Sequence, residues 1–432
     1  MDETSDQHPI HKAVSSYITD VEGIRFSAGL TSVLLLAINK TVGEKYNSAL
    51  KLYPEIAGKP GRYEVPADKT GGLNKLEAEC IRSQRANEIV PRSLLVALVS
   101  QYDAFLSGLV SALFALQPAL MKDSSRTIPF SDLLTYSSID EAKHSVIEAE
   151  IESLLRDSHH EQFDWLQNKF GIKTLKKFDT WGEFVELTQR RNLFVHSNGR
   201  VSKQYLRALE DCGVPKKELK IGDQLEADGS YVRHSADVLY ETAVKLSQVL
   251  WRKVLPNDLK EADSSISEIT FSLIERKRYG LASSILDFAA ECITKYSSPD
   301  VKLALIINRA NAYRLQGKND KCKEIIDAED WRAYDLKFRL AIHILRDERD
   351  EAYKCMKQIG STGSVKKSFY REWPIFEGIK SEQRFKETFK EIFDEEFVEG
   401  KILISQDGQD AIEDNSDFSL DVFSELPDYN QT

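Results

Sequence analysis

The stretch RRNLFVHSNG, residues 190–199, carries three polar side chains, Arg191, Asn192 and His196, within two helical turns. It follows an apolar-periodic run, and the Asn-Gly pair that closes it is typical of the point where a helix stops. We therefore predict that the stretch forms the last two turns of a helix. Whether this helix exposes the three side chains to solvent or directs them at a substrate decides the function.

The predicted helix starts near Asp179 or Thr180, because Thr180 and Glu183 have capping-box spacing. At about 100° per residue, Glu183, Glu186 and Arg190 fall on the side that we expect to be solvated. The opposite sector collects six residues that we expect to be buried: Trp181, Phe184, Leu187, Thr188, Phe194 and Val195.

Arg191 falls near the middle of the buried sector, and Asn192 and His196 lie together at its edge. A guanidinium in a packed face must be paired or must line a cleft. Three roles stay open for Arg191: a structural ion pair with a buried acid, for which Asp103 is the candidate, a dimer-interface contact, or a phosphate ligand. The helix dipole favours the imidazolium of His196, so its titration is expected near neutrality, where proton transfer is most useful.

Asp103 is the only charged residue between Ser93 and Met121. An apolar stretch of about 20 residues can cross a bilayer, but a central Asp costs roughly 2.5–3.5 kcal/mol on insertion. We expect a helix buried in a protein core or a dimer interface, with no membrane contact.

Further helices are predicted on both sides of these segments. Residues 1–75 are expected to form an N-terminal helical segment, followed by a helix over about 76–90 and then the apolar helix. Ser138 and Glu141 have capping-box spacing at the start of a helix that runs to Arg156. A short helix is expected at residues 160–170, and a long amphipathic helix is expected at residues 231–255.

From residue 264 to 400 the pattern changes to paired helices with a loose repeat. Three segments, RYGLASSIL, KNDKCKEII and ERDEAYKCM, each place a small residue four positions before a larger apolar one. Their separations, 40 and 30 residues, straddle the tetratricopeptide period of about 34. We predict a helical-repeat-like domain over 264–400, with an irregular helical bundle as the alternative.

The formal net charge of −11 is unfavourable for binding a polyanion, but it is unevenly distributed. Residues 404–432 contain eight acidic residues and no basic residue, which leaves −3 for the rest of the chain. We expect this acidic tail to be disordered. Two lysine clusters, at 169–177 and 216–220, are expected to be solvated surface unless the fold joins them into a basic stripe.

The five cysteines have no paired spacing, which fits a reducing compartment, and no N-terminal signal pattern is evident, so we expect a cytoplasmic protein. His159 and His160 are expected to be an exposed pair, His8 and His11 to lie in a flexible N-terminus, and His234 to lack a local partner. No motif predicts a metal ion or a cofactor.

RNLFVH, residues 191–196, resembles the signature of HEPN-superfamily ribonucleases: Arg, a polar residue, three variable residues and His. These are all-helical proteins common in toxin, CRISPR and phage-defence systems. The likeness extends over RRNLFVHSNGRVSKQYL, residues 190–206, and LVSQYDAFLSGL, residues 98–109, resembles an early core helix of the family. It covers roughly residues 85–255, and we take residues 76–255 as a HEPN-like domain.

The resemblance implies metal-independent RNA cleavage by attack of a ribose 2′-OH on the adjacent phosphodiester. His196 would transfer protons, Arg191 would clamp the phosphate, Asn192 would orient His196 or the substrate, and Asp103 would position Arg191. One histidine per chain does not easily make both proton transfers. A homodimer or a higher even oligomer, with two copies of the motif helix facing one cleft, is therefore expected.

The sequence thus predicts an all-α protein, a HEPN-like helical bundle followed by a helical-repeat-like domain. We expect an endoribonuclease that is conditionally active, as a toxin or abortive-infection effector is, with a protein partner or trigger at the repeats. The alternative is a non-catalytic adaptor that dimerises through the bundle and recruits partners through the repeats. A nucleotide-sensing or nucleotidyl-accepting partner of a neighbouring enzyme is a further alternative.

Overall fold

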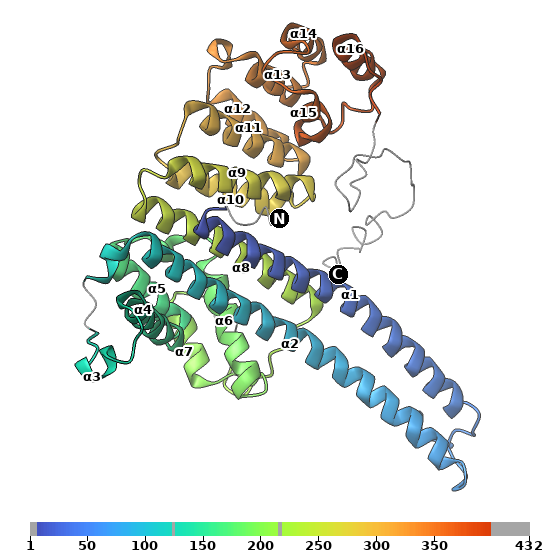
Figure 1. Cartoon of the computed structure of the whole chain (residues 1–432). Coiled ribbons are helices and arrows are strands. Elements are labelled where there is room, and N and C mark those ends of the chain that lie inside the picture. Colours follow the sequence, from blue (N-terminus) through green and yellow to red (C-terminus); the bar gives the residue numbers. More distant parts are fainter. Residues whose placement is uncertain (1–6, 123–125, 215–217, 399–432) are drawn as a thin grey trace. The chain divides into compact units, whose positions relative to one another are not determined.

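The computed structural model describes residues 7–122, 126–214 and 218–398, and it is all-helical, as predicted (Figure 1). Over these residues it has sixteen α-helices and no β-strand. The chain divides into two compact units, residues 1–317 and 318–432. The predicted acidic tail at 404–432, with Lys216 and Lys217 of the second lysine cluster, lies outside the described residues.

The first unit contains eleven α-helices: α1 (Pro9–Leu50), α2 (Thr70–Leu116), α3 (Phe130–Leu133), α4 (Ile139–Arg156), α5 (His159–Phe170), α6 (Trp181–His196), α7 (Lys203–Asp211), α8 (Gly229–Val254), α9 (Leu259–Glu275), α10 (Tyr279–Cys292) and α11 (Pro299–Leu315). The second unit contains α12 (Asn319–Asp327), α13 (Leu336–Leu345), α14 (Arg349–Ile359), α15 (Lys367–Glu372) and α16 (Gln383–Phe393).

The core of the first unit forms around α8, which packs on α1, α2, α6, α9 and α10. This helix is buried on nearly every side, including a Glu241–Lys245 ion pair of 2.6 Å. The Lys245 ammonium lies over the rings of Phe178 and Phe288, which accommodate its charge. Because α8 is surrounded by other helices, it provides the common packing surface for the helices of the first unit.

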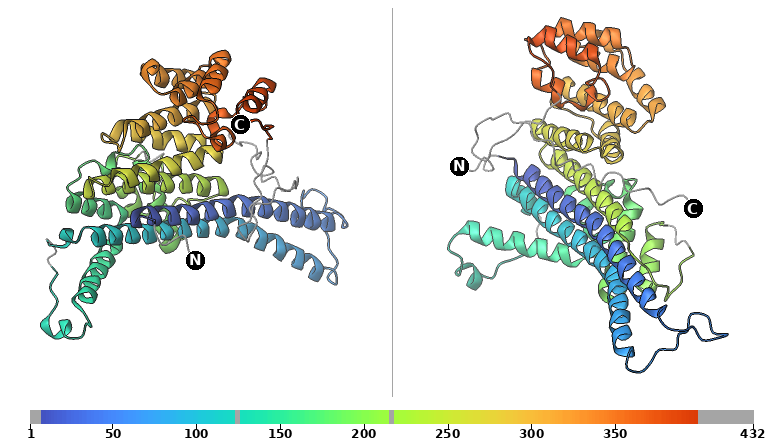
Figure 2. Two further views of the ribbon diagram at one scale, coloured as in Figure 1. Left: turned by 45° about the horizontal axis from the view of Figure 1, so that its top comes forward. Right: turned by 90° about the vertical axis from the view of Figure 1, so that its right-hand side faces the viewer.

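The long helices α1 and α2 pack along each other, and they correct one prediction and confirm another (Figure 1 and Figure 2). The separate helices expected before and after residue 90 form one continuous α2, with Pro91 inside it and buried. Proline removes one hydrogen bond, and packing against the neighbouring helices outweighs that loss. The predicted burial of the apolar segment is confirmed, because Leu95, Tyr102 and Phe114 are fully buried.

By length and composition alone, α1 and α2 could each cross a membrane, which is weak evidence for a membrane protein. The apolar part of α2 belongs instead to the core described above. Buried core helices of soluble proteins have the same composition.

The expected flexible N-terminus is wrong for residues from His8 onward. The His8 imidazole stacks on Trp251, with ring centroids 4.3 Å apart, and caps α1. Its neighbour His11 is buried and hydrogen-bonded to Ser265 at 3.0 Å. Helix α1, which falls within the predicted N-terminal segment, packs on α2, α8 and α9 and is part of the same helical core.

The boundary between the compact units also differs from the predicted start of a repeat domain at residue 264. Helices α9, α10 and α11 group by their contacts with the first unit. The small residues of the proposed repeat, Ala282, Cys322 and Ala352, are buried, as close helix packing requires. A tetratricopeptide-like repeat stays a prediction.

Several local predictions are confirmed. Ser138 caps α4, accepting a hydrogen bond from the Glu141 backbone N–H, and α4 ends at Arg156. The segment before α6 is a helix that stops at Gly171, where φ is +63°. These signals act within one helical turn, which makes them readable from sequence.

Candidate functional site

Helix α6 lies against α2, α5, α7 and α8. Phe184, Leu187 and Thr188 are buried as predicted. At the C-terminal end the prediction fails, because Leu193 is buried whereas Val195 is 50% exposed. The last turn of α6 therefore presents part of its surface to solvent.

Arg191 is paired with the carboxylate proposed for it. Its Nη2 lies 3.5 Å from Asp103 Oδ2, and its Nη1 donates a hydrogen bond to Asn192 Oδ1 at 3.1 Å. The side chains of Arg191 and Asp103 are 22% and 27% exposed, so water screens the pair only partly. The Arg191 Nε atom is buried and has no hydrogen-bond partner within the described structure. Both Nη atoms of this guanidinium are therefore engaged, by Asp103 and by Asn192, and its Nε is an unsatisfied donor that solvent does not reach.

His159 completes the arrangement, and it corrects the prediction of an exposed histidine pair. Its Nε2 lies 3.0 Å from Asp103 Oδ1, and its ring is buried against Tyr102 and Phe184. His159, Asp103, Arg191 and Asn192 thus form one continuous polar chain across α5, α2 and α6. The adjacent Tyr102 hydroxyl is buried, and burial together with the Asp103 charge raises its pKa well above the usual value.

A second arginine approaches the end of α6 from α2. Arg92 lies 5.2 Å over the Phe194 ring and donates to Asn198 Oδ1 at 3.3 Å. This guanidinium was not among the predicted site residues. It belongs to the face of α2 that contacts α6, and the sequence spacing to residue 198 gave no signal of that contact.

The chain leaves α6 through the predicted stop. Asn198 and Gly199 both have positive φ, of 47° and 77°. Gly199 packs so closely that an added Cβ would lie 2.9 Å from the Leu225 carbonyl oxygen. Backbone hydrogen bonds between Val201 and the 222–223 segment then hold the chain beside the helix end. The position of the last turn is therefore set by backbone packing.

His196 lies on that last turn and is exposed. Within the part of the chain that the structure describes, its imidazole has no hydrogen-bond or ion-pair partner. The four predicted residues are thus divided: Arg191, Asn192 and Asp103 contact one another, and His196 stands one turn further along α6, open to solvent.

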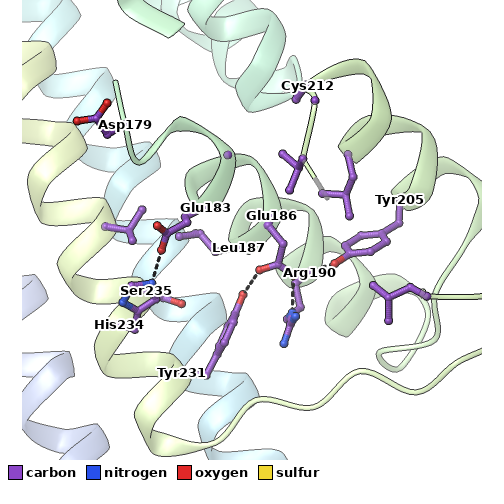
Figure 3. A pocket seen from close by; sticks show the side chains of 16 residues that line it. Asp179, Glu183, Glu186, Leu187, Arg190, Tyr205, Cys212, Tyr231, His234 and Ser235 are labelled. Atoms are coloured by element: carbon purple, nitrogen blue, oxygen red, sulfur yellow. Dashed lines mark hydrogen bonds and ion pairs between the residues drawn. The ribbon is translucent and has the colours of Figure 1, made fainter. Parts of the chain in front are cut away.

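The opposite face of α6 was predicted to be solvated at Glu183, Glu186 and Arg190; Glu183 is exposed as predicted, but Glu186 and Arg190 are mostly buried. Glu186 accepts hydrogen bonds from the Tyr205 hydroxyl at 2.7 Å, the Tyr231 hydroxyl at 2.6 Å and Arg190 Nε at 2.7 Å (Figure 3). Arg190 also lies 4.2 Å over the Tyr231 ring. Burial, followed by the Glu186 charge, raises the pKa of both tyrosines. This cluster ties α7 and α8 to α6.

The same cluster lines a cavity of about 710 Å³ between α6, α7 and α8. Near its edge Glu183 bonds to His234, so the predicted capping box with Thr180 does not form, and His234 has a partner after all (Figure 3). The polar groups that line the cavity mostly satisfy one another, which favours a structural role for them.

The first lysine cluster does not form a stripe over the motif. Lys176 is paired with Asp164 and lies 5.8 Å over the Trp181 ring, and Lys169 lies over Phe114. These ammonium groups are engaged within the first unit. Arg191, on α6 itself, and Arg92, which contacts Phe194 and Asn198, are the cations that the structure places at the C-terminal part of α6.

Within the described residues, no group of three or more His, Cys, Asp or Glu side chains is arranged to hold a metal ion. Comparison with known protein families, with curated proteins and with solved structures finds no match for this chain. The geometry of α6 and its neighbours is therefore what bears on function.

Proposed function

We propose that this chain is a metal-independent endoribonuclease of the HEPN type, acting as a homodimer or higher even oligomer. The observation that supports this best is the half-buried chain from His159 through Asp103 to Arg191, on the same helix as a His196 that is exposed and unpaired among the described residues. A guanidinium held on a carboxylate is preorganised for a phosphate, and an unpaired imidazole is available for proton transfer.

In the proposed reaction, His196 of one protomer removes the proton of a ribose 2′-OH, whose oxygen attacks the adjacent phosphorus. The partner's His196 protonates the 5′-oxygen as it leaves, so the products are a 2′,3′-cyclic phosphate and a 5′-hydroxyl. Arg191 neutralises the negative charge that develops on the phosphorane oxygens. Asp103 and His159 fix Arg191, and Asn192 restrains its other end.

The biological setting is proposed from the resemblance to the family. A continuously active ribonuclease would harm its own cell, so we infer a cytoplasmic, conditionally active toxin or abortive-infection effector. The helices from α9 onward would bind the protein partner or trigger. No cofactor is invoked.

The test is cleavage of total RNA and of transfer RNA by the purified chain in the presence of EDTA. We expect cleavage with cyclic-phosphate ends, and its loss in His196→Ala and Arg191→Ala. As a matched control, His234→Ala removes a histidine of α8 that bonds to Glu183 of α6, and it should leave cleavage intact. Equal inactivity of the wild type and all variants would support the alternative function, a non-catalytic dimerising adaptor.

A further inference from the structure

The outer half of α1 has its more apolar face exposed. We define the α1 seam as Leu30, Val33, Leu34, Ala37 and Ile38. Their i, i+3, i+4, i+7 and i+8 spacing places them along one face of the helix. All five are exposed, the four larger ones between 39% and 55%. Figure 2 shows this part of α1, with its α2 neighbour, extending beyond the other helices of the first unit.

The opposite face of the same segment, which packs on α2 and α8, is more polar. Ser32 lies against Gly229 of α8, where no Cβ could be accommodated. Asn39 is hydrogen-bonded to Ser83 of α2. A helix of a soluble protein normally turns its apolar face inward. The reversed arrangement here marks the α1 seam as a surface that another helix covers.

A lipid bilayer is a poor cover for this surface. The part of α2 beside the α1 seam carries Arg82 and Arg85, and the next turn toward the tip of the helical pair carries Glu77 and Glu79, all exposed. Insertion of the helical pair would transfer these charges into hydrocarbon, which is strongly unfavourable. A protein helix covers the apolar face and leaves the charged face of α2 in water.

We propose that the α1 seam is the docking surface for a second copy of this chain, with the two α1 helices packed antiparallel about Leu34. This inference rests on the proposed function in one respect, that a shared cleavage site needs a second copy. The seam itself is argued independently of catalysis.

The charges of α1 favour the antiparallel arrangement. Parallel packing would oppose Lys40 to its own copy and Glu44 to its own copy. Both are exposed and unpaired among the described residues. Antiparallel packing about Leu34 instead places Lys40 at the level of residue 28. It also gives a closed two-fold dimer in which one surface is complementary to itself.

The area of the α1 seam is sufficient for a specific dimer. At about 180 Å² for a fully exposed large apolar side chain, the seam exposes about 350 Å² per copy. An area of about 350 Å² lies within the range of the largest apolar patch on a typical monomer, and such a patch is often functional. Because roughly 60% of an interface is apolar, two seams correspond to about 1,200 Å² of buried surface, which reaches the range of specific interfaces.

The α1 seam also lies at the level of the candidate site along α2. Contacts of Tyr17 with Tyr102, and of Asn39 with Ser83, set the register of the two helices. In this register Leu30 is level with about residue 90 of α2. Arg92, which bonds to the residue after the motif helix, is therefore close to that level.

The test is the molar mass of the full chain in solution without RNA, measured by sedimentation at several concentrations. We expect a dimer, and Leu34→Glu should raise its dissociation constant by at least about 100-fold, because two carboxylates would meet at the two-fold axis. Leu36 is 65% exposed on the same helix but points away from the seam, so Leu36→Glu is the matched control and should stay dimeric. A Leu34→Cys variant in a Cys292→Ser background should cross-link, and Leu36→Cys should not.

A monomeric wild type, or a dimer that is equally stable in Leu34→Glu and Leu36→Glu, would overturn the proposal. So would flotation of the wild type with phosphatidylcholine vesicles that Leu34→Glu abolishes, because it would identify a lipid surface as the cover. A seam-dependent dimer that cleaves no RNA in EDTA would support this inference and count against the proposed function.

Discussion

The Arg191–Asp103 pair leads to a quantitative prediction for Asp103→Asn. The substitution keeps the shape of the side chain and leaves an oxygen that can accept a hydrogen bond from His159. It removes the negative charge that faces Arg191. Breaking a fully buried pair costs about 3–5 kcal/mol, and an exposed pair contributes about 0.2–1 kcal/mol. With both side chains about a quarter exposed, we expect a loss of about 1–2 kcal/mol in the free energy of unfolding.

Urea denaturation followed by circular dichroism measures this loss. Asp20 is exposed and unpaired among the described residues, so Asp20→Asn is a matched control that should change stability by less than about 0.5 kcal/mol. A double-mutant cycle with Arg191→Gln should give a coupling energy of about 1 kcal/mol between the two side chains.

The same Asp103→Asn variant should lose RNA cleavage by up to about 100-fold in kcat, because a phosphate clamp that moves by about 1 Å no longer holds the reacting geometry. Two results together would refute the reasoning: additive stability changes in the double-mutant cycle, and wild-type cleavage by Asp103→Asn. They would mean that Asp103 neither pairs productively with Arg191 nor positions it.

Three further predictions concern the first unit. Burial lowers the pKa of His8 below its usual 6.5, so folding favours the neutral ring, and stability should be full above about pH 6.5 and fall as the pH drops below it. In thermal unfolding between about pH 8 and pH 5, the melting temperature of His8→Gln should fall less steeply with decreasing pH than that of the wild type. Identical slopes in the two proteins would contradict this. Gly199→Ala should cost about 1–2 kcal/mol in urea denaturation, from its positive φ and the clash with Leu225, and an unchanged midpoint would exclude strain there. Asp263→Ala should cost about 3–5 kcal/mol, because it leaves Arg252 buried without its carboxylate; a loss below about 1 kcal/mol would count against that pair.

Predictions from the sequence succeeded where the relevant interaction lies within a few turns of helix. Capping at Ser138 and the stop at Gly199 are local, and both are present. The Arg191–Asp103 pair was also anticipated, although the residues are far apart in sequence, because a cation in an apolar face requires an anion and the apolar helices offered one candidate.

Predictions failed where a side chain is paired with a residue of another helix and no buried charge made such a partner necessary. Glu186 looked solvated because its own helix gave it no partner, yet Tyr205 and Tyr231 reach it from α7 and α8. The burial of His159 could have been inferred from its i, i+3 and i+4 relation to Gln162 and Phe163. Adjacent histidines suggested an exposed pair instead.

The sequence by itself determined that this protein is helical, where many of its helices begin and end, and that Arg191 must have a partner. Periodicity, capping and the cost of burying a charge all act along one helix or within one apolar face. Only the tertiary structure decided that His159 joins Asp103, that Glu186 is enclosed and that α1 turns its apolar face outward. Those outcomes depend on which helix faces which, and that is set by packing between segments many residues apart.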